Sequence, residues 1–165
     1  GVHTFYVMAG GTPLLVHNTG IDPSNGFRGG GYDQIFTKKF NVERHHMFAK
    51  WLIENVNFKW IDSSIAPSIE MWWRDHHLTE THGGKFASKN SIYKKDITKL
   101  LTRGPYEVTF SNGNTFRRHG VRDAMAMEIR DIRSIARKTG NPRQYNKALM
   151  EMMEYARSLK LIPCK

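Results

Sequence analysis

The sequence predicts an α+β protein with a mostly helical C-terminal third. Short segments rich in β-formers lie in the first half of the chain, and apolar residues recur at helical spacing in 121–140 and 145–160. With 165 residues, the chain is long enough for one medium domain, or for a compact domain with a short appendage.

The first segment, "HTFYVMAGGTPLLVH" (3–17), predicts two short strands around a turn, because apolar β-formers flank a cluster of turn residues. The following stretch, "NTGIDPSNGFRGGG" (18–31), has few side chains able to pack. We therefore expect an appendage over 1–19, a flexible linker over 20–31 and the main domain over 32–165.

From residue 32 the pattern is that of a folded domain. "KKFNVERHHMF" predicts a strand, "FAKWLIENVNF" a short amphipathic helix, and "APSIEM" an extended segment. The side of that first helix expected to be apolar carries Phe48, Trp51, Leu52 and Val56. "WWRDHHLTETHGG" then predicts a helical segment stopped by Gly83 and Gly84, and "SIYKKDITKLL" predicts another helix.

The last third shows the clearest helical periodicity. Two Met-rich stripes there are expected to be core, since methionine commonly fills irregular gaps between packed elements. The first consists of Val121, Met125, Ile129, Ile132 and Ala136, and the second of Tyr145, Leu149, Met152, Met153, Ala156 and Leu159.

Charge and cysteine content limit the classes of function. The net charge of +10 favours polyanionic partners, with nucleic acid first and an acidic membrane or acidic protein behind it. No apolar run approaches the roughly 20 residues that span a bilayer, which disfavours a pore-forming protein. The single cysteine, Cys164, excludes an internal disulfide and disfavours a zinc deaminase, which needs paired cysteines.

His17 and Asn18 follow the second predicted strand. An Asn side chain can attack its own backbone carbonyl and break the chain, and a neighbouring His can assist by proton transfer; the same pair is also compatible with an ordinary strand end and turn. The stretch "FYVMAGGTPLLVHNT" resembles the C-terminal end of Hint (intein-like) autoprocessing domains, which precede toxin modules in bacterial polymorphic toxins. The resemblance implies that His17 and Asn18 are an autoprocessing remnant and that the residues after about 20 are toxin cargo.

Five of the eight histidines are concentrated in two segments of the sequence, as His45-His46 in the first and His76-His77 with His82 in the second. Clustered imidazoles in a basic protein with one cysteine indicate a divalent-cation site, although histidines also serve as core or surface hydrogen-bonders. Hydrolysis of a phosphodiester needs a base for water and a cation for the phosphate charge. Where a strand runs into a loop, one of two adjacent histidines can face a cation while the other faces the substrate.

The segments "RHHM" and "APSIEMWWRDHHLTETHG" resemble the HNH/endonuclease VII (His-Me finger) toxin nucleases marked by an x-His-His motif. "GVRDAMAMEIRDIRSIARKTGNPRQYNKALMEMMEYA" is similar to the helical tail of that group, so the resemblance covers about residues 40–157. It implies a ββα-metal core in which His46 is the general base. His45 is then a metal ligand or a catalytic orienting partner, and His76 is a metal ligand from the helix.

The remaining residues of this region leave alternatives open. His82 is a further candidate ligand, whereas His77 points about 100° away from His76 on a helix. Asp75 either orients His76 as a hydrogen-bond acceptor or favours the N-terminus of the helix. Trp72 and Trp73 can stack on bases or wall the site, and we expect at least one of them in the core.

Basic side chains give candidate contacts to nucleic acid. Arg44, Arg74 and Lys85 flank the histidines and can each hold a phosphate. Arg122, Arg130, Arg133 and Arg137 lie opposite the apolar stripe of the 121–140 helix. They form either a track for backbone binding or an ordinary solvated face.

The resulting hypothesis is a nuclease toxin that uses one divalent ion (Mg, Zn, Ni or Mn) to cut DNA in competitor cells. An RNase of the same fold and a non-catalytic nucleic-acid-binding domain with a structural metal are the alternatives. The resemblance implies export as the C-terminal part of a larger toxin polypeptide, action in the recipient cytoplasm, and a cognate immunity protein. An acidic immunity protein would complement the charge of +10, and membrane insertion by this domain is not expected.

Overall fold

The computed structural model describes residues 4–9, 12–17, 26–35, 39–56, 61–88, 91–109 and 111–162. Within them the protein combines antiparallel sheets with six helices, so the predicted α+β class is confirmed. The helical C-terminal third is confirmed as well, because α5 (Gly120–Lys138) and α6 (Asn146–Ser158) occupy most of it.

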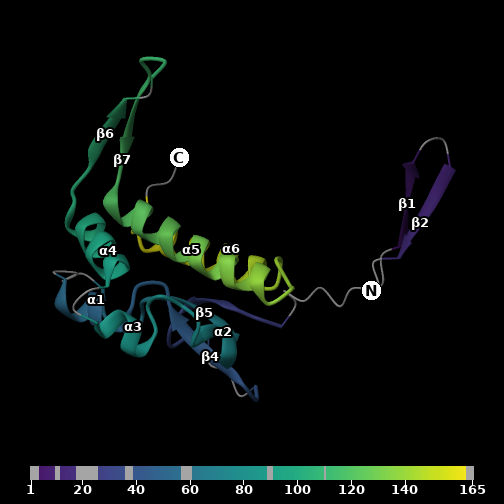
Figure 1. The fold of residues 1–165 in the computed structure, drawn as a ribbon, viewed down its shortest axis with the longest axis horizontal. Coiled ribbons are helices and arrows are strands. Elements are labelled where there is room, and N and C mark those ends of the chain that lie inside the picture. Colours follow the sequence, from purple (N-terminus) through teal and green to yellow (C-terminus); the bar gives the residue numbers. More distant parts are fainter. Residues whose placement is uncertain are drawn as a thin grey trace.

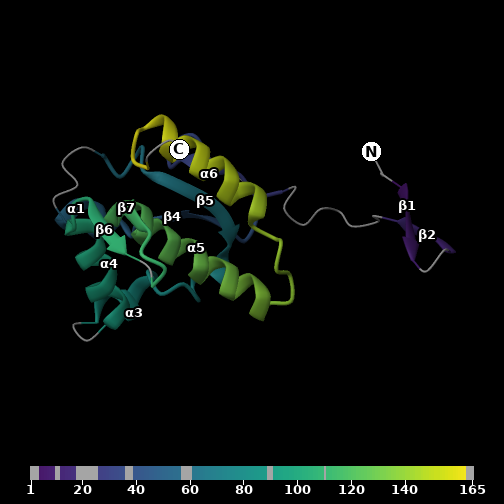
Figure 2. The same cartoon turned by 90° about the horizontal axis from the view of Figure 1, so that it is seen from above.

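A three-stranded antiparallel sheet organises the fold. It contains β3 (Gly29–Gly31), β4 (Val42–His46) and β5 (Pro67–Trp72), in the order β3-β5-β4. The central strand β5 is buried along nearly its whole length, and α6 packs against both β3 and β5 (Figures 1 and 2). In the register of β4 with β5, His45 is opposite Ile69 and His46 is opposite Ser68.

The linker predicted over 20–31 is wrong for the part that the structure describes, residues 26–31. Phe27 is buried at 5% exposure, and Gly29–Gly31 form strand β3. A Cβ atom on Gly29 would collide with the backbone of Ala148, so glycine there permits α6 to approach the sheet closely. Composition suggested flexibility, whereas these glycines provide close packing.

Several helices fall where the sequence predicts them. The helix expected in 48–58 is α1 (Lys50–Asn55), and the one expected in 91–101 is α4 (Ile92–Thr102). On α1, Leu52 is buried as predicted, but Trp51 is 43% exposed and Ile53 is buried instead. Of the two Met-rich stripes, Val121, Ile129, Met153 and Leu159 are partly buried against the core and all other members are buried.

The prediction for the segment 72–84 is wrong in one respect. The helix α2 (Trp73–His76) ends seven residues before Gly83, and Gly83 begins a second short helix, α3 (Gly83–Ala87). Gly83 has φ of 53°, a left-handed conformation that glycine adopts without strain. The glycine pair therefore allows a change of direction between turn and helix, and His82 lies in the turn between α2 and α3.

Two hairpins complete the described fold. β1 (Thr4–Ala9) and β2 (Thr12–His17) pair antiparallel as predicted, and in both views this hairpin lies apart from the other elements (Figures 1 and 2). His17 is the last residue of β2, and Asn18 lies outside the described residues. The hairpin of β6 (Tyr106–Thr109) and β7 (Thr115–Arg118) was not expected from the sequence and projects beyond α4 and α5 (Figure 1). None of the helices described has the length and apolar character needed to cross a bilayer.

Candidate functional site

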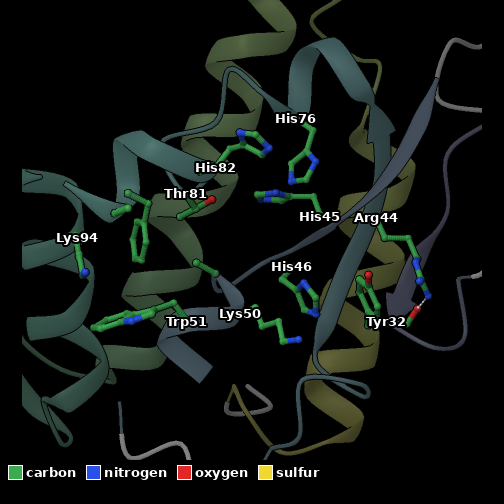
Figure 3. Close-up of a pocket in the computed structure, with 14 residues that line it drawn as sticks. Tyr32, Arg44, His45, His46, Lys50, Trp51, His76, Thr81, His82 and Lys94 are labelled. Atoms are coloured by element: carbon green, nitrogen blue, oxygen red, sulfur yellow. Dashed lines mark hydrogen bonds between the residues drawn. The ribbon is translucent and has the colours of Figure 1, made fainter. Parts of the chain in front are cut away.

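Strand β4 carries the histidine pair, and its alternation sends neighbouring side chains to opposite faces. Glu43 and His45 share one face, while Arg44 and His46 share the other. Figure 3 shows the rings of His45 and His46 directed to different sides of the strand. The adjacent histidines therefore meet two different sets of neighbours.

On the first face, His45 belongs to a cluster of three imidazoles with His76 of α2 and His82 of the following turn (Figure 3). The ring centroids of His45 and His76 are 5.1 Å apart, and those of His76 and His82 are 4.8 Å apart. His45 is only 2% exposed. The structure thus brings together the three residues that the sequence nominates as metal ligands.

His77 lies at the outer edge of this cluster. Its ring stacks on that of His82 at 4.0 Å and is 6.1 Å from that of His76. The other neighbour is Trp73, at 4.5 Å between ring centroids. His77 therefore covers the cluster from the solvent side.

Glu43 supplies the hydrogen-bond partner that orients His76. The Nδ1–H of His76 donates to Oε2 of Glu43 at 2.5 Å, which leaves Nε2 of His76 to bind another group. Asp75 does not take this part: its Oδ2 accepts hydrogen bonds from Gln144 Nε2 at 2.8 Å and from Tyr145 OH at 2.6 Å. Asp75 thereby ties α2 to the start of α6.

On the second face, His46 stacks on Tyr32, with ring centroids 4.1 Å apart and an interplanar angle of 12°. The guanidinium of Arg44 lies 3.7 Å from the centroid of the same ring, and the Tyr32 ring lies between them in Figure 3. Nε2 of His46 is 3.0 Å from the Ser63 carbonyl, so Nε2 carries the proton that it donates there. The lone pair that can accept a proton then resides on Nδ1.

Burial lowers the pKa of four of these histidines, His45, His46, His76 and His82, from the usual 6.5. The pKa of His45 is lowered most, by full burial and then by the neighbouring His76. For His46, the bond to the Ser63 carbonyl opposes burial, and for His76, Glu43 opposes it. For His82, burial has the largest effect, and the nearby His76 and His77 lower the pKa further. Neutral imidazoles can act as bases and as metal ligands at neutral pH.

A cavity of about 520 Å³ joins the two faces at the end of β4. Four histidines and three cationic side chains line it, together with aromatic and small residues: Tyr32, Arg44, His45, His46, Ala49, Lys50, Trp51, His76, Thr81, His82, Gly83, Phe86, Ala87 and Lys94. No acidic residue is among these described lining residues. The cavity therefore has the electrostatic character of an anion site.

The other basic residues predicted to contact nucleic acid lie outside this cavity. Lys85 is exposed and donates to the Leu78 carbonyl at 3.2 Å. Arg130 and Arg133 are exposed on α5, as are Arg122 and Arg137. This arrangement is compatible both with a track for nucleic-acid backbone and with an ordinary solvated face.

Arg74 lines a second cavity of about 750 Å³ together with Trp72 and Trp73. Both tryptophans are substantially exposed, at 42% and 45%, so the expectation that one of them is core is wrong. Trp72 makes an edge contact with Phe27 at 5.2 Å between centroids, which explains its partial burial.

Sequence reasoning missed Tyr32, Glu43, Lys50, Lys94 and Glu128. For Glu43 a signal was available, because residues two apart on a strand share a face and His45 was already nominated. No local signal marks Glu128, a fully buried acid on α5 whose Oε2 is 3.8 Å from Nε2 of His45.

The donor types of the first face fit a divalent cation. Within the described residues, no three His, Cys, Asp or Glu side chains stand ready to hold a metal ion, so the rings would have to turn to bind one. His45, His76 and His82 nevertheless offer neutral ring nitrogens, which are donors that Zn and Ni favour.

Comparisons of the chain with protein-family models, with curated proteins and with solved structures find no match. The fold and the site by themselves define an α+β protein with a cavity at the end of a strand, lined by histidines and by arginine and lysine side chains.

Proposed function

We propose that the chain is a metal-dependent endonuclease that hydrolyses phosphodiester bonds of DNA, and that it acts as the toxin part of a larger exported polypeptide. The observation that carries this proposal is the cavity at the end of β4, which four histidines and three cationic side chains line without an acidic residue among its described residues. Such a cavity attracts a phosphodiester and places neutral bases beside it.

His46 has the properties of a general base. Donation of Nε2–H to the Ser63 carbonyl fixes the tautomer and leaves Nδ1 basic. In the proposed reaction, His46 takes a proton from water, the water oxygen bonds to phosphorus, and the P–O bond to the leaving sugar oxygen breaks. That oxygen takes a proton from solvent, His46 returns its own proton to solvent, and the products are a phosphate monoester and an alcohol.

His45, His76 and His82 would hold the divalent ion, which supplies positive charge to the phosphate and to the leaving oxygen. Glu43 holds the ring of His76 in one tautomer. Arg44, Lys50 and Lys94, which line the same cavity, would position the flanking phosphates. The order β4, β5, α2, with α1 inserted between the strands, supports a ββα-metal core.

The hairpin β1–β2 supports the biological context. Its two strands coincide with the segment whose sequence resembles the end of a Hint-type domain, and His17 is the last residue of the second strand. A nuclease of this kind endangers its producer, so we propose a cognate, acidic immunity protein and action in the cytoplasm of a recipient cell. The charge of +10 makes an acidic inhibitor physically reasonable.

Incubation of the purified chain with supercoiled plasmid, and separately with structured RNA, tests the function. Each is done with magnesium, manganese, zinc or nickel, and with chelator, for the wild type, His46→Ala and His76→Ala. Metal-dependent nicking of the plasmid that His46→Ala abolishes would support the proposal, and His76→Ala should also weaken metal binding. Cleavage of RNA alone would make the chain an RNase, and binding with both polymers intact would make it a non-catalytic binding domain.

A further inference from the structure

A group of polar atoms lies buried beneath the cavity. Within the described residues, five buried side-chain atoms lack a hydrogen-bond partner, and all belong to four residues: His45 Nε2, Thr81 Oγ1, Tyr93 OH and both carboxyl oxygens of Glu128. They come from β4, the turn after α2, α4 and α5. Four separate elements thus direct polar groups into one part of the core.

Glu128 is the least expected of these residues. Its side chain is 0% exposed, and it lies on α5 between Met125 and Ile132, which are both core residues. Burial raises the pKa of its carboxyl well above 4.5, with Asp131 adding to the rise. A leucine or methionine would fill such a position without the cost of burying a carboxyl. A residue that violates the core pattern in this way commonly serves function.

On the cavity side, Glu128 lies beside His45. Oε2 of Glu128 and Nε2 of His45 are 3.8 Å apart, which is roughly 0.6 Å longer than an ordinary N–H···O hydrogen bond, so a small movement of either side chain would be needed to form one. Glu128 itself is not among the residues that line the cavity. Thr81 and Tyr93 lie close enough to interact with its carboxyl without completing a hydrogen bond. Glu128 can therefore act on the cavity through two residues that line it, His45 and Thr81. Of these two, only His45 carries ring nitrogens that can bind a cation or act as a base.

We propose that Glu128 is a positioning residue that accepts the Nε2–H of His45 and thereby fixes the tautomer and the ring orientation of that histidine. Nδ1 of His45 is then the nitrogen left to bind a cation or substrate. The relevance of this contact to activity rests on the proposed function. The tautomer of His45 can be measured whether or not that function is correct. The carbonyl oxygen of a carboxyl group can accept this N–H whether or not the group is ionised, and an acceptor behind an imidazole ligand orients the ring.

In this arrangement Glu43 and Glu128 each orient a different histidine on the same face of β4. Glu43 holds Nδ1 of His76 from the solvent side, and Glu128 holds Nε2 of His45 from the core side. The cluster is supported by acids from two different elements, β4 and α5. The helical C-terminal third would therefore complete the site as well as provide core.

The first test uses the metal-free chain. Nitrogen-15 NMR of histidine-labelled protein reports which ring nitrogen of His45 carries the proton. The Nε2–H form is expected in the wild type, a mixture or the Nδ1–H form in Glu128→Leu, and a retained Nε2–H form in Glu128→Gln, which keeps an acceptor oxygen. Asp123→Asn is the control, because Asp123 is also a buried acid on α5 and pairs with Tyr106. An unchanged tautomer in Glu128→Leu would overturn the proposal.

The second test is titration of each variant with zinc and with nickel by calorimetry. Glu128→Leu should lower the affinity roughly 10- to 100-fold, and Asp123→Asn should not change it. When His45 is already replaced by Ala, the additional change Glu128→Leu should not lower the metal affinity further. A further loss of affinity would make Glu128 a direct ligand and overturn the positioning role. If the wild type binds neither ion while the tautomer shifts as expected, the metal part of the proposed function fails and the inference on Glu128 stands.

Discussion

The two faces of β4 give adjacent histidines contrasting surroundings. His45 is 2% exposed among other imidazoles and close to a buried carboxyl. His46 is partly exposed, stacks on an aromatic ring and bonds to a backbone carbonyl. A cluster of neutral imidazoles with acids behind it suits a cation, whereas a single oriented imidazole suits proton transfer. Strand alternation is sufficient to give neighbouring residues these two different environments.

The largest effect is expected from His46→Ala. If His46 is the general base proposed above, its loss should lower the rate of plasmid cleavage by roughly 10²- to 10⁴-fold. Zinc affinity should remain close to that of the wild type, because His46 is on the other face of β4. His119→Ala is a matched control at the start of α5 and should cleave normally. If His46→Ala weakens zinc binding as strongly as His76→Ala does, the division between the faces does not exist.

Glu43→Gln should have the next largest effect. The carboxylate that receives Nδ1–H of His76 becomes a neutral amide, so metal affinity should fall roughly 10- to 100-fold in a calorimetric titration. Glu54→Gln removes an exposed acid that pairs with Lys50 on α1 and should leave the affinity unchanged. Equal affinities for all three proteins would mean that Glu43 only shields His76 from solvent.

The stability of the metal-free protein should decrease on acidification. The folded pKa values of the four histidines lie below the 6.5 of the unfolded chain, so the unfolded state binds more protons in this range. Stability is therefore present above about pH 6.5 and is lost as the pH falls through the folded values. Glu128 acts with the opposite sign, because its raised pKa favours the folded state at low pH.

Thermal melting in chelator between pH 7.5 and 5 measures this dependence, with Glu128→Leu used to remove the opposing contribution. His45→Ala should flatten the dependence more than His46→Ala does, since His45 is the more deeply buried. A dependence that neither substitution alters would place its origin outside the two faces of β4.

The smallest effect concerns the exposed face of α5, outside the cavity. If the exposed Arg130 and Arg133 contact the phosphate backbone, replacing both with Gln should reduce the slope of log affinity against log salt by about 2, on the order of one for each contact. Arg44→Gln supplies a comparison from the cavity. An unchanged slope in the Arg130 and Arg133 variant would make α5 a solvated face and would confine substrate contacts to the cavity.

Local patterns predicted much of the fold. Helices α4, α5 and α6 follow from periodicity, and β4 and β5 from short runs of β-formers. The errors arose where a residue's role depends on a partner far away in the sequence. Gly29 is a packing residue because α6 lies on it, and Asp75 binds Gln144 and Tyr145 instead of His76.

For the candidate site, the sequence by itself determined the histidines, their concentration in two neighbouring segments and the basic charge. It also determined that His45 and His46 face opposite ways, because the pleat of a strand dictates that alternation. Only the tertiary structure decided which groups meet them. Packing of the chain brings Tyr32 and the Ser63 carbonyl against His46. It also brings Glu43 of β4 against His76 and Glu128 of α5 near His45. Contacts between distant segments depend on how whole elements pack, and that information is absent from any local pattern.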